Sequence, residues 1–302
     1  NLAAQGIHHD VLRDVSTSIS MACVEASDQK FQPGKSYTVS KFFEGERRNK
    51  PTRRMGTGEY SDVALLYSEM WKYGPSSAMT IGQKKKRIVA LLAADSAARP
   101  SDVARLFRVF EGWQQQIVFT SWGVKVRFFY TKEIVPGSSR TNSTGYWFTT
   151  WVNINKTEPA EISTPELLRD YLGCTSGPEY ATQHITELDT DAQPLVFARK
   201  RSKKWQPASV DHISKLVYES LQESGMEAMT MKSVRGASPS KLVQIFSDME
   251  PQAIALGRWT EPKTFRNHYQ APVKLESLET PPAAMKANVQ QVLRWGFRPS
   301  PP

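Results

Sequence analysis

Residue periodicity changes twice along this chain, and the two changes constrain the fold more than any other feature. In the first third the apolar residues recur at helical spacing, as Val11, Val15 and Ile19 do. The segments QQIVFT, GVKVRFFYTKE and TGYWFTTWVNI follow, rich in β-branched and aromatic residues that alternate with polar ones. Helical spacing then returns. The pattern predicts a mainly α protein with a small antiparallel sheet of about three strands, an α+β class.

Most of the chain is expected to be helical. The expected helices span residues 8–25, 38–44, 62–71, 81–92, 101–110, 165–172, 207–224, 229–236, 240–248, 251–257 and 283–295. Ser101 is expected to cap the helix that buries Val103, Leu106 and Phe107. Pro239 is expected to end one helix and start the next, because proline lacks the N–H that a helix interior requires.

A basic segment with no apolar periodicity divides the chain. The stretch ERRNKPTRRMGTG, residues 46–58, holds five Lys or Arg, one proline and two glycines. This composition is typical of a linker, either a solvated loop or a connector that lies on a phosphate backbone. We therefore expect a helical domain at 1–48, a linker at 49–58, a larger domain at 59–274 and a C-terminal tail at 275–302.

The chain carries an excess of positive charge. Lys and Arg number 39 and Asp and Glu 30, which gives a net charge of +9 and favours a polyanionic partner. The run KKKR at Lys84–Arg87 is typical of a solvated helix face, with a phosphate contact or a nuclear address as alternatives. The two cysteines, Cys23 and Cys174, form no CxxC or Cys/His pattern, so no zinc site is expected. No apolar run reaches transmembrane length, so no membrane partner is expected.

Several basic residues occur where their charges need a partner. Pro100 restricts Arg99 to an extended conformation at a helix junction, where Asp102 can brace it. Lys232 and Arg235 are three residues apart, so on a helix they share one face. Two cations so placed repel each other unless an anion lies between them.

This arrangement, with Trp259 and Tyr269 downstream, resembles the tyrosine recombinases, which break and rejoin DNA through a phosphotyrosine. Their pattern is an arginine after an apolar helix, a lysine in a β-hairpin, a His/Lys-x-x-Arg pair, a His or Trp, and the tyrosine. The phrases SKFFEGERRNKPTRR, RFFYTKE and GRWTEPKTFRNHY are similar to those of the eukaryotic mobile-element branch, the Crypton transposons and DIRS/Ngaro retroelements. The likeness covers roughly residues 8–275.

The resemblance implies a set of site residues. The implied catalytic residues are Arg99, Lys132, Lys232, Arg235, Trp259 and Tyr269, with Asp102 in support. Tyr269 is the implied nucleophile, the arginines bind the phosphate, and Lys132 is the implied general acid, with Lys125 as the alternative on the same hairpin. The chain departs from the common pattern where Lys232 and Trp259 replace histidines, so the usual proton acceptor is missing. His268, beside the nucleophile, is a weaker substitute.

The resemblance also implies partners. They are double-stranded DNA and further copies of the chain, a dimer on one site and a tetramer in synapsis, in the nucleus and without a cofactor. The expected DNA-contacting residues are Arg53, Arg54, Arg201, Lys203 and Lys204. The tail either packs on its own core or docks on a neighbouring protomer. Two rival functions stay open: a silent DNA-binding protein derived from a recombinase, and a type IB topoisomerase.

Overall fold

The computed structural model describes residues 59–109, 116–121, 123–128, 146–151, 159–176, 193–199, 205–259 and 261–299. The chain divides into two compact units, residues 1–57 and 58–302, and all described residues belong to the second. The domain expected at 1–48, with its helices at 8–25 and 38–44, and the linker expected at 49–58 lie outside the described residues.

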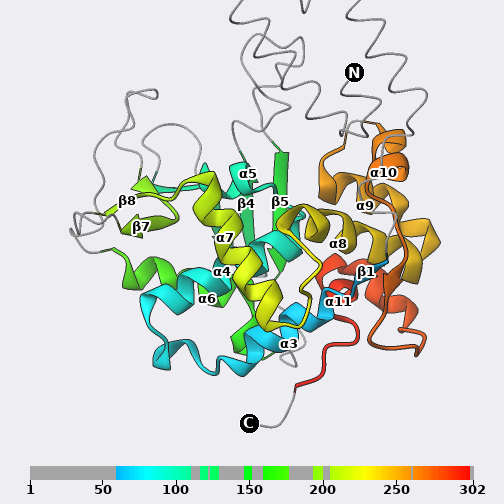
Figure 1. The fold of residues 1–302 in the computed structure, drawn as a ribbon, viewed down its shortest axis with the longest axis horizontal. Helices are drawn as coiled ribbons and strands as arrows, with labels where there is room; N and C mark the ends of the chain where they lie inside the picture. Colours follow the sequence, from blue (N-terminus) through cyan, green and yellow to red (C-terminus); the bar gives the residue numbers. More distant parts are fainter. Residues whose placement is uncertain are drawn as a thin grey trace, which may run out of the picture. The chain divides into compact units, whose positions relative to one another are not determined.

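Within the described residues, helices are the main regular structure (Figure 1). The helices are α3 (Ala64–Lys72), α4 (Ile81–Ser96), α5 (Pro100–Ala104), α6 (Thr164–Cys174), α7 (Val210–Glu223), α8 (Met231–Ile245), α9 (Glu250–Gly257), α10 (Pro262–His268) and α11 (Val289–Arg294). The strands are β1 (Tyr60–Ser61), β2 (Phe107–Val109), β3 (Ile117–Thr120), β4 (Gly123–Phe128), β5 (Tyr146–Trp151), β6 (Gln193–Pro194), β7 (Phe197–Arg199), β8 (Trp205–Pro207) and β9 (Val273–Lys274). The predicted α+β class, mostly helical with small antiparallel sheets, is confirmed.

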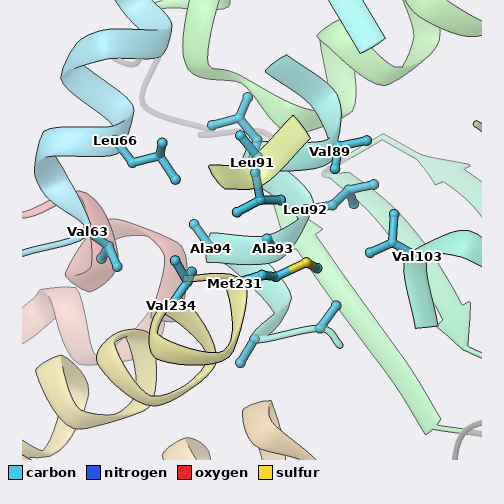
Figure 2. Close-up of a cluster of buried hydrophobic side chains, with 14 of the residues drawn as sticks. Val63, Leu66, Val89, Leu91, Leu92, Ala93, Ala94, Val103, Met231 and Val234 are labelled. Carbon is cyan, nitrogen blue, oxygen red and sulfur yellow. The ribbon is translucent and has the colours of Figure 1, made fainter. Parts of the chain in front are cut away.

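Helix α4 is the centre of the core. It starts at a capping box, in which the Thr80 hydroxyl accepts the Gln83 N–H and the Gln83 side chain accepts the Thr80 N–H. Its second half is fully buried and packs on α3, α6, α7 and α8. Figure 2 shows Val89, Leu91 and Leu92 of α4 in a cluster with side chains of α3, α5 and α8. Each such buried side chain stabilises the fold by roughly 1.5–3 kcal/mol.

The predicted three-stranded sheet is confirmed. Strands β3, β4 and β5 form an antiparallel meander in that order, with Val118 opposite Lys125 and Val126 opposite Phe148. Along β4 the buried residues Val124, Val126 and Phe128 alternate with half-buried basic ones. This is the alternation expected of a strand with one face against the core. A separate pair, β1 and β9, runs parallel and joins the start of the unit to its last quarter.

The expected start of the helix at Ser101 is wrong. Arg99 is the N-cap and Pro100 occupies the first helical position, where its missing N–H and fixed φ cost nothing. The helix also ends early, at Ala104, and Phe107 lies in strand β2. Its partner is β6, almost ninety residues further along the chain, and a local pattern cannot reveal such a pairing.

The expected break at Pro239 is also wrong. The two predicted helices are one, α8, which runs through Pro239. A proline inside a helix costs about 3 kcal/mol. Here every residue from Val234 to Leu242 is buried, so the packing of the helix outweighs that cost.

The basic run Lys84–Arg87 is not a solvated face. Lys84 Nζ lies 2.8 Å from Asp170 Oδ2 of α6, and Lys86 Nζ lies 2.5 Å from Glu223 Oε1 of α7. Arg87 is fully buried and donates through Nη2 to the carbonyl of Gly74 at 2.8 Å. The prediction fails because α4 is covered on several sides, so even its polar first turns meet neighbouring helices.

Of the two alternatives for the C-terminal tail, the structure has the packing on its own core. Val292 and Leu293 of α11 are fully buried against α8, α3 and α4. The ammonium of Lys241 donates to the carbonyls of Leu293 and Trp295, at 2.9 and 2.6 Å, and pairs with Asp62 Oδ1 at 2.5 Å. The described part of the tail is therefore an integral part of the unit.

Candidate active site

Three side chains from separate segments stack beside the first half of α8. They are Arg235 of α8, Trp259 just after α9, and Tyr269, which follows the last residue of α10. The guanidinium carbon of Arg235 lies 5.1 Å from the ring centre of Trp259 and 5.7 Å from that of Tyr269. The two aromatic rings are 4.7 Å apart. A cation beside two aromatic rings is a favourable contact. Three of the predicted site residues therefore form one cluster.

Arg235 is anchored and almost fully buried. Only 2% of the residue is exposed. Its Nη1 donates to the carbonyl of Ala97 at 2.7 Å, and its Nη2 donates to the carbonyl of Gly257. Since a guanidinium has five N–H donors, two backbone contacts leave further donors, and Nε is buried with no hydrogen-bond partner in the described parts of the chain.

The surroundings of Arg235 disfavour its charged form. Burial above all, and then the nearby charges of Arg258 and Arg99, lower its pKa to about 10, while Tyr269 and Asp102 act in the opposite direction. The guanidinium therefore stays protonated at neutral pH, but in surroundings with a surplus of positive charge. An anion in contact with it would relieve this cost, because opposite charges favour the charged form.

Arg99 lies beside this cluster, at the junction between α4 and α5. It is half-buried and extended, with φ −79° and ψ 155°, as the following proline predicts. Its backbone N–H donates to Asp102 Oδ2 at 3.0 Å. Asp102 therefore holds the Arg99 backbone in place and caps the start of α5.

Arg258 is a member of the site that sequence reasoning missed. It adopts a left-handed conformation, φ 55°, that favours glycine, and its side chain is 2% exposed. It donates to Asp102 Oδ2 at 2.7 Å and to the carbonyl of Ser96 at 3.0 Å, and lies 4.7 Å from the Phe128 ring centre. The only signal in the sequence is its place between Gly257 and Trp259.

The indole of Trp259 has a free donor. The residue is 8% exposed, and its Nε1–H is buried with no hydrogen-bond partner among the described residues. The ring also stacks on Phe265 at 5.0 Å. A side chain at Gly257 would overlap the Trp259 ring, so glycine is required there. Since a buried donor without a partner costs about 1–3 kcal/mol, this N–H is suited to a ligand oxygen.

Of the other predicted residues, the structure describes three and does not describe the rest. Lys232 is exposed near the start of α8, whereas Arg235 on the same helix is buried. Lys125 lies in the middle of β4 and is half-buried, and His268 is exposed. The remaining predicted residues lie outside the described residues: Lys132, Arg53, Arg54, Arg201, Lys203 and Lys204.

No known protein-family model matches the chain, and no curated protein is significantly similar to it. Within the described ranges, no helix is long and apolar enough to cross a membrane. Across those same ranges, no three His, Cys, Asp or Glu side chains gather closely enough to hold a metal ion. The described side chains of the site are a phenol, an indole and three guanidinium groups near one carboxylate.

Proposed function

We propose that the protein is a DNA strand transferase that cuts and rejoins DNA through a 3′-phosphotyrosine at Tyr269. The observation that carries the proposal is the stacking of the Tyr269 phenol on the buried guanidinium of Arg235. Arg99 and Arg258 lie close enough for their charges to lower the pKa of Arg235. Fixed cations around a reactive oxygen suit phosphoryl transfer, which depends mainly on positioning and on stabilising charge.

The reaction follows from these groups. The Tyr269 oxygen attacks the phosphorus in line, its proton passes to solvent water at this half-buried residue, a phosphotyrosine bond forms, and the bond to the 5′ oxygen breaks. That oxygen leaves with a proton, for which Lys132 is the candidate donor and Lys125 the alternative. Arg235 and Arg99 bind the non-bridging oxygens, and the indole N–H of Trp259 donates to one of them. Attack by a 5′ hydroxyl on the phosphotyrosine reverses the step, so strands are rejoined without ATP.

The sequence resemblance adds a substrate, an assembly and a set of DNA contacts to the proposal. The strand exchange would excise or integrate a mobile element in the nucleus, with a dimer on each site and a tetramer in synapsis. Arg53, Arg54, Arg201, Lys203 and Lys204 would contact the phosphate backbone, which sets affinity without reading sequence. Lys232 would add a charge near the scissile phosphate.

A trapping experiment tests the chemistry. The full chain is mixed with fluorescent, nicked duplexes of random sequence, in which a short cleaved fragment diffuses away and leaves protein joined to DNA. We expect a labelled adduct that survives denaturation and maps to Tyr269 by mass spectrometry. Tyr269→Phe should abolish the adduct and leave DNA binding intact. Tyr218→Phe, at an exposed tyrosine on α7, is the matched control and should form the adduct normally.

Each other outcome selects a rival. DNA binding with no adduct in the parent protein indicates a silent DNA-binding protein. Relaxation of supercoiled plasmid by dilute monomer, at no preferred site, indicates a topoisomerase. An adduct on another tyrosine means that the site is misassigned.

A further inference from the structure

Gly236, Ser240 and Gln244 lie one turn apart along α8 and form a stripe that contacts the backbone near Gln270. Ser240 is 2% exposed, and its Oγ donates to the carbonyl of Tyr269 at 3.2 Å. The same oxygen accepts the N–H of Ala271, also at 3.2 Å. Tyr269 ends α10, so its carbonyl has no place in the helix ladder. A single buried hydroxyl therefore holds the backbone of the proposed nucleophile.

Gln244, one helical turn further on, repeats the contact. Its Nε2 donates to the carbonyl of Val273 at 2.8 Å, and its Oε1 accepts the Val273 N–H at 2.7 Å. Four residues of helix rise by about 6 Å, and two residues of extended chain advance by roughly 6.6 Å. Because these distances match, side chains at Ser240 and Gln244 meet alternate residues of the segment 269–273.

Gly236 completes the stripe one turn earlier. A Cβ at this position would overlap the hydroxyl of Tyr60 and lie 3.1 Å from the carbonyl of Tyr269. The absence of a side chain therefore lets Tyr60 and the nucleophile segment approach α8 closely. Tyr60 also donates its backbone N–H to the carbonyl of Pro272 at 2.8 Å, so the segment is bonded from two sides.

Arg235 precedes this stripe in the same helix and is itself anchored to the carbonyls of Ala97 and Gly257. One rigid element thus holds both the phosphate-binding guanidinium and the backbone of the attacking residue. Resting on the proposed function, we propose that Ser240 and Gln244 are positioning residues that hold Tyr269 at Arg235 of the same chain. Each chain then attacks the phosphate that its own arginines bind.

Ser240→Ala tests the positioning role. We expect the rate of adduct formation on the nicked duplex pool to fall about 10- to 100-fold at saturating DNA, because small displacements of a reacting group have effects of this size. The DNA concentration that gives half of the maximal rate should stay within about twofold, since uniform binding is unchanged. Gln244→Met, which keeps the shape and loses both hydrogen bonds, should act in the same direction.

Ser238→Ala is the matched control. Ser238 is on the same helix and equally buried, but its hydroxyl has no hydrogen-bond partner among the described residues. Its loss should leave the rate unchanged. Equal rates for Ser240→Ala and Ser238→Ala would overturn the proposal. So would a fall in rate that only follows the folded fraction, measured by thermal unfolding.

A mixture of two inactive variants tests the action within one chain. Tyr269→Phe lacks the nucleophile and Arg235→Lys lacks the guanidinium but keeps a charge. We expect an equimolar mixture to form no adduct on the nicked pool, because no chain holds both groups. Adduct formation by the mixture would show attack on a neighbour's phosphate and overturn the proposal.

Amide hydrogen exchange separates this proposal from the proposed function. In Ser240→Ala the N–H of Ala271 loses its acceptor, so it should exchange faster than in the parent and in Ser238→Ala, without DNA. Unchanged exchange would show that the hydroxyl holds nothing, whatever the enzyme does. If exchange is faster in Ser240→Ala but the parent protein forms no adduct, the Ser240 hydrogen bonds are real and the proposed strand-transfer function is refuted.

Discussion

Two buried arginine–aspartate pairs of this unit contain the same types of side chain but differ in the charges around their carboxylates. In the first, Asp95 of α4 meets Arg294 of α11, whose guanidinium also lies 4.7 Å from the ring centre of Tyr67. In the second, Asp102 of α5 meets Arg258, which lies on the ring of Phe128. Both pairs join distant segments, and in both an aromatic face covers the cation.

The two carboxylates differ in how fully they are satisfied. Asp95 Oδ1 accepts from Tyr67 and Arg294, at 2.7 and 3.1 Å, and Oδ2 accepts from Thr164 and Arg294, at 2.6 and 3.3 Å. Asp102 accepts two bonds at Oδ2, while its Oδ1 is buried with no partner in the described parts of the chain.

The charges around the two carboxylates differ as well. Asp95 pairs with Arg294, whereas Asp102 shares its neighbourhood with Arg258, Arg235 and Arg99. The pair of Asp95 and Arg294 connects α4 to α11 in a fixed position. A cluster that holds several cations beside one carboxylate, with an indole N–H that has no partner among the described residues, is the kind of site that an anion would stabilise.

The largest expected effect comes from breaking the balanced pair. Asp95→Ala leaves the Arg294 guanidinium buried without its partner, which costs about 3–5 kcal/mol. Urea unfolding should show this as a lower midpoint with an unchanged slope. The double variant Asp95→Leu with Arg294→Met should recover most of the loss, because no charge is then left alone. A single variant as stable as the parent would contradict the structural role of this pair.

Removing one arginine should distinguish the two pairs. Arg294→Met strands Asp95 and should cost about 3–5 kcal/mol. Arg258→Met should cost less, about 1–2 kcal/mol, since Asp102 keeps other cations nearby and repulsion on Arg235 falls. The comparison needs only urea unfolding of the two variants side by side. Equal losses would mean that the second cluster has no surplus charge.

Anions should stabilise the second cluster. Sulfate at ten times its dissociation constant adds about 1.4 kcal/mol to the unfolding free energy of a protein with one site. Thermal unfolding in sulfate and in chloride, at equal ionic strength, measures the difference. Sulfate also stabilises proteins in general, so Arg235→Met is the control. An equal gain in the parent and in this variant would show that no anion site exists there.

The smallest expected effect is a pH dependence at Arg235. Its folded pKa, about 10, lies below the unfolded value, so above pH 10 the unfolded chain binds the proton that the folded chain releases. Stability contributed by this group therefore rises with pH, by about 1 kcal/mol between pH 9 and 11. The check is the difference in unfolding free energy between parent and Arg235→Met over this range. A difference that falls with pH would show that the guanidinium is not desolvated.

Local patterns were sufficient where neighbours along the chain decide the structure. The three-stranded meander follows from alternation within each strand, and the extended Arg99 follows from the proline after it. The order of Arg235, Trp259 and Tyr269 pointed to one site, and these three side chains do meet. The roles of Lys132, Lys232 and the basic residues of the linker stay predictions.

Tertiary contacts decided the rest, because the deciding partners lie far away in sequence. The continuity of α8 through Pro239 depends on burial along its whole middle, and the pairing of Lys84 depends on α6, more than eighty residues later. Arg258 joined the site because Asp102 and Ser96 are brought to it in space. The sequence alone determined the class of fold, the three-stranded meander and which chemical groups are present. Only the packing decided how each charge is paired, because burial and long-range pairing set the electrostatic environment of each group.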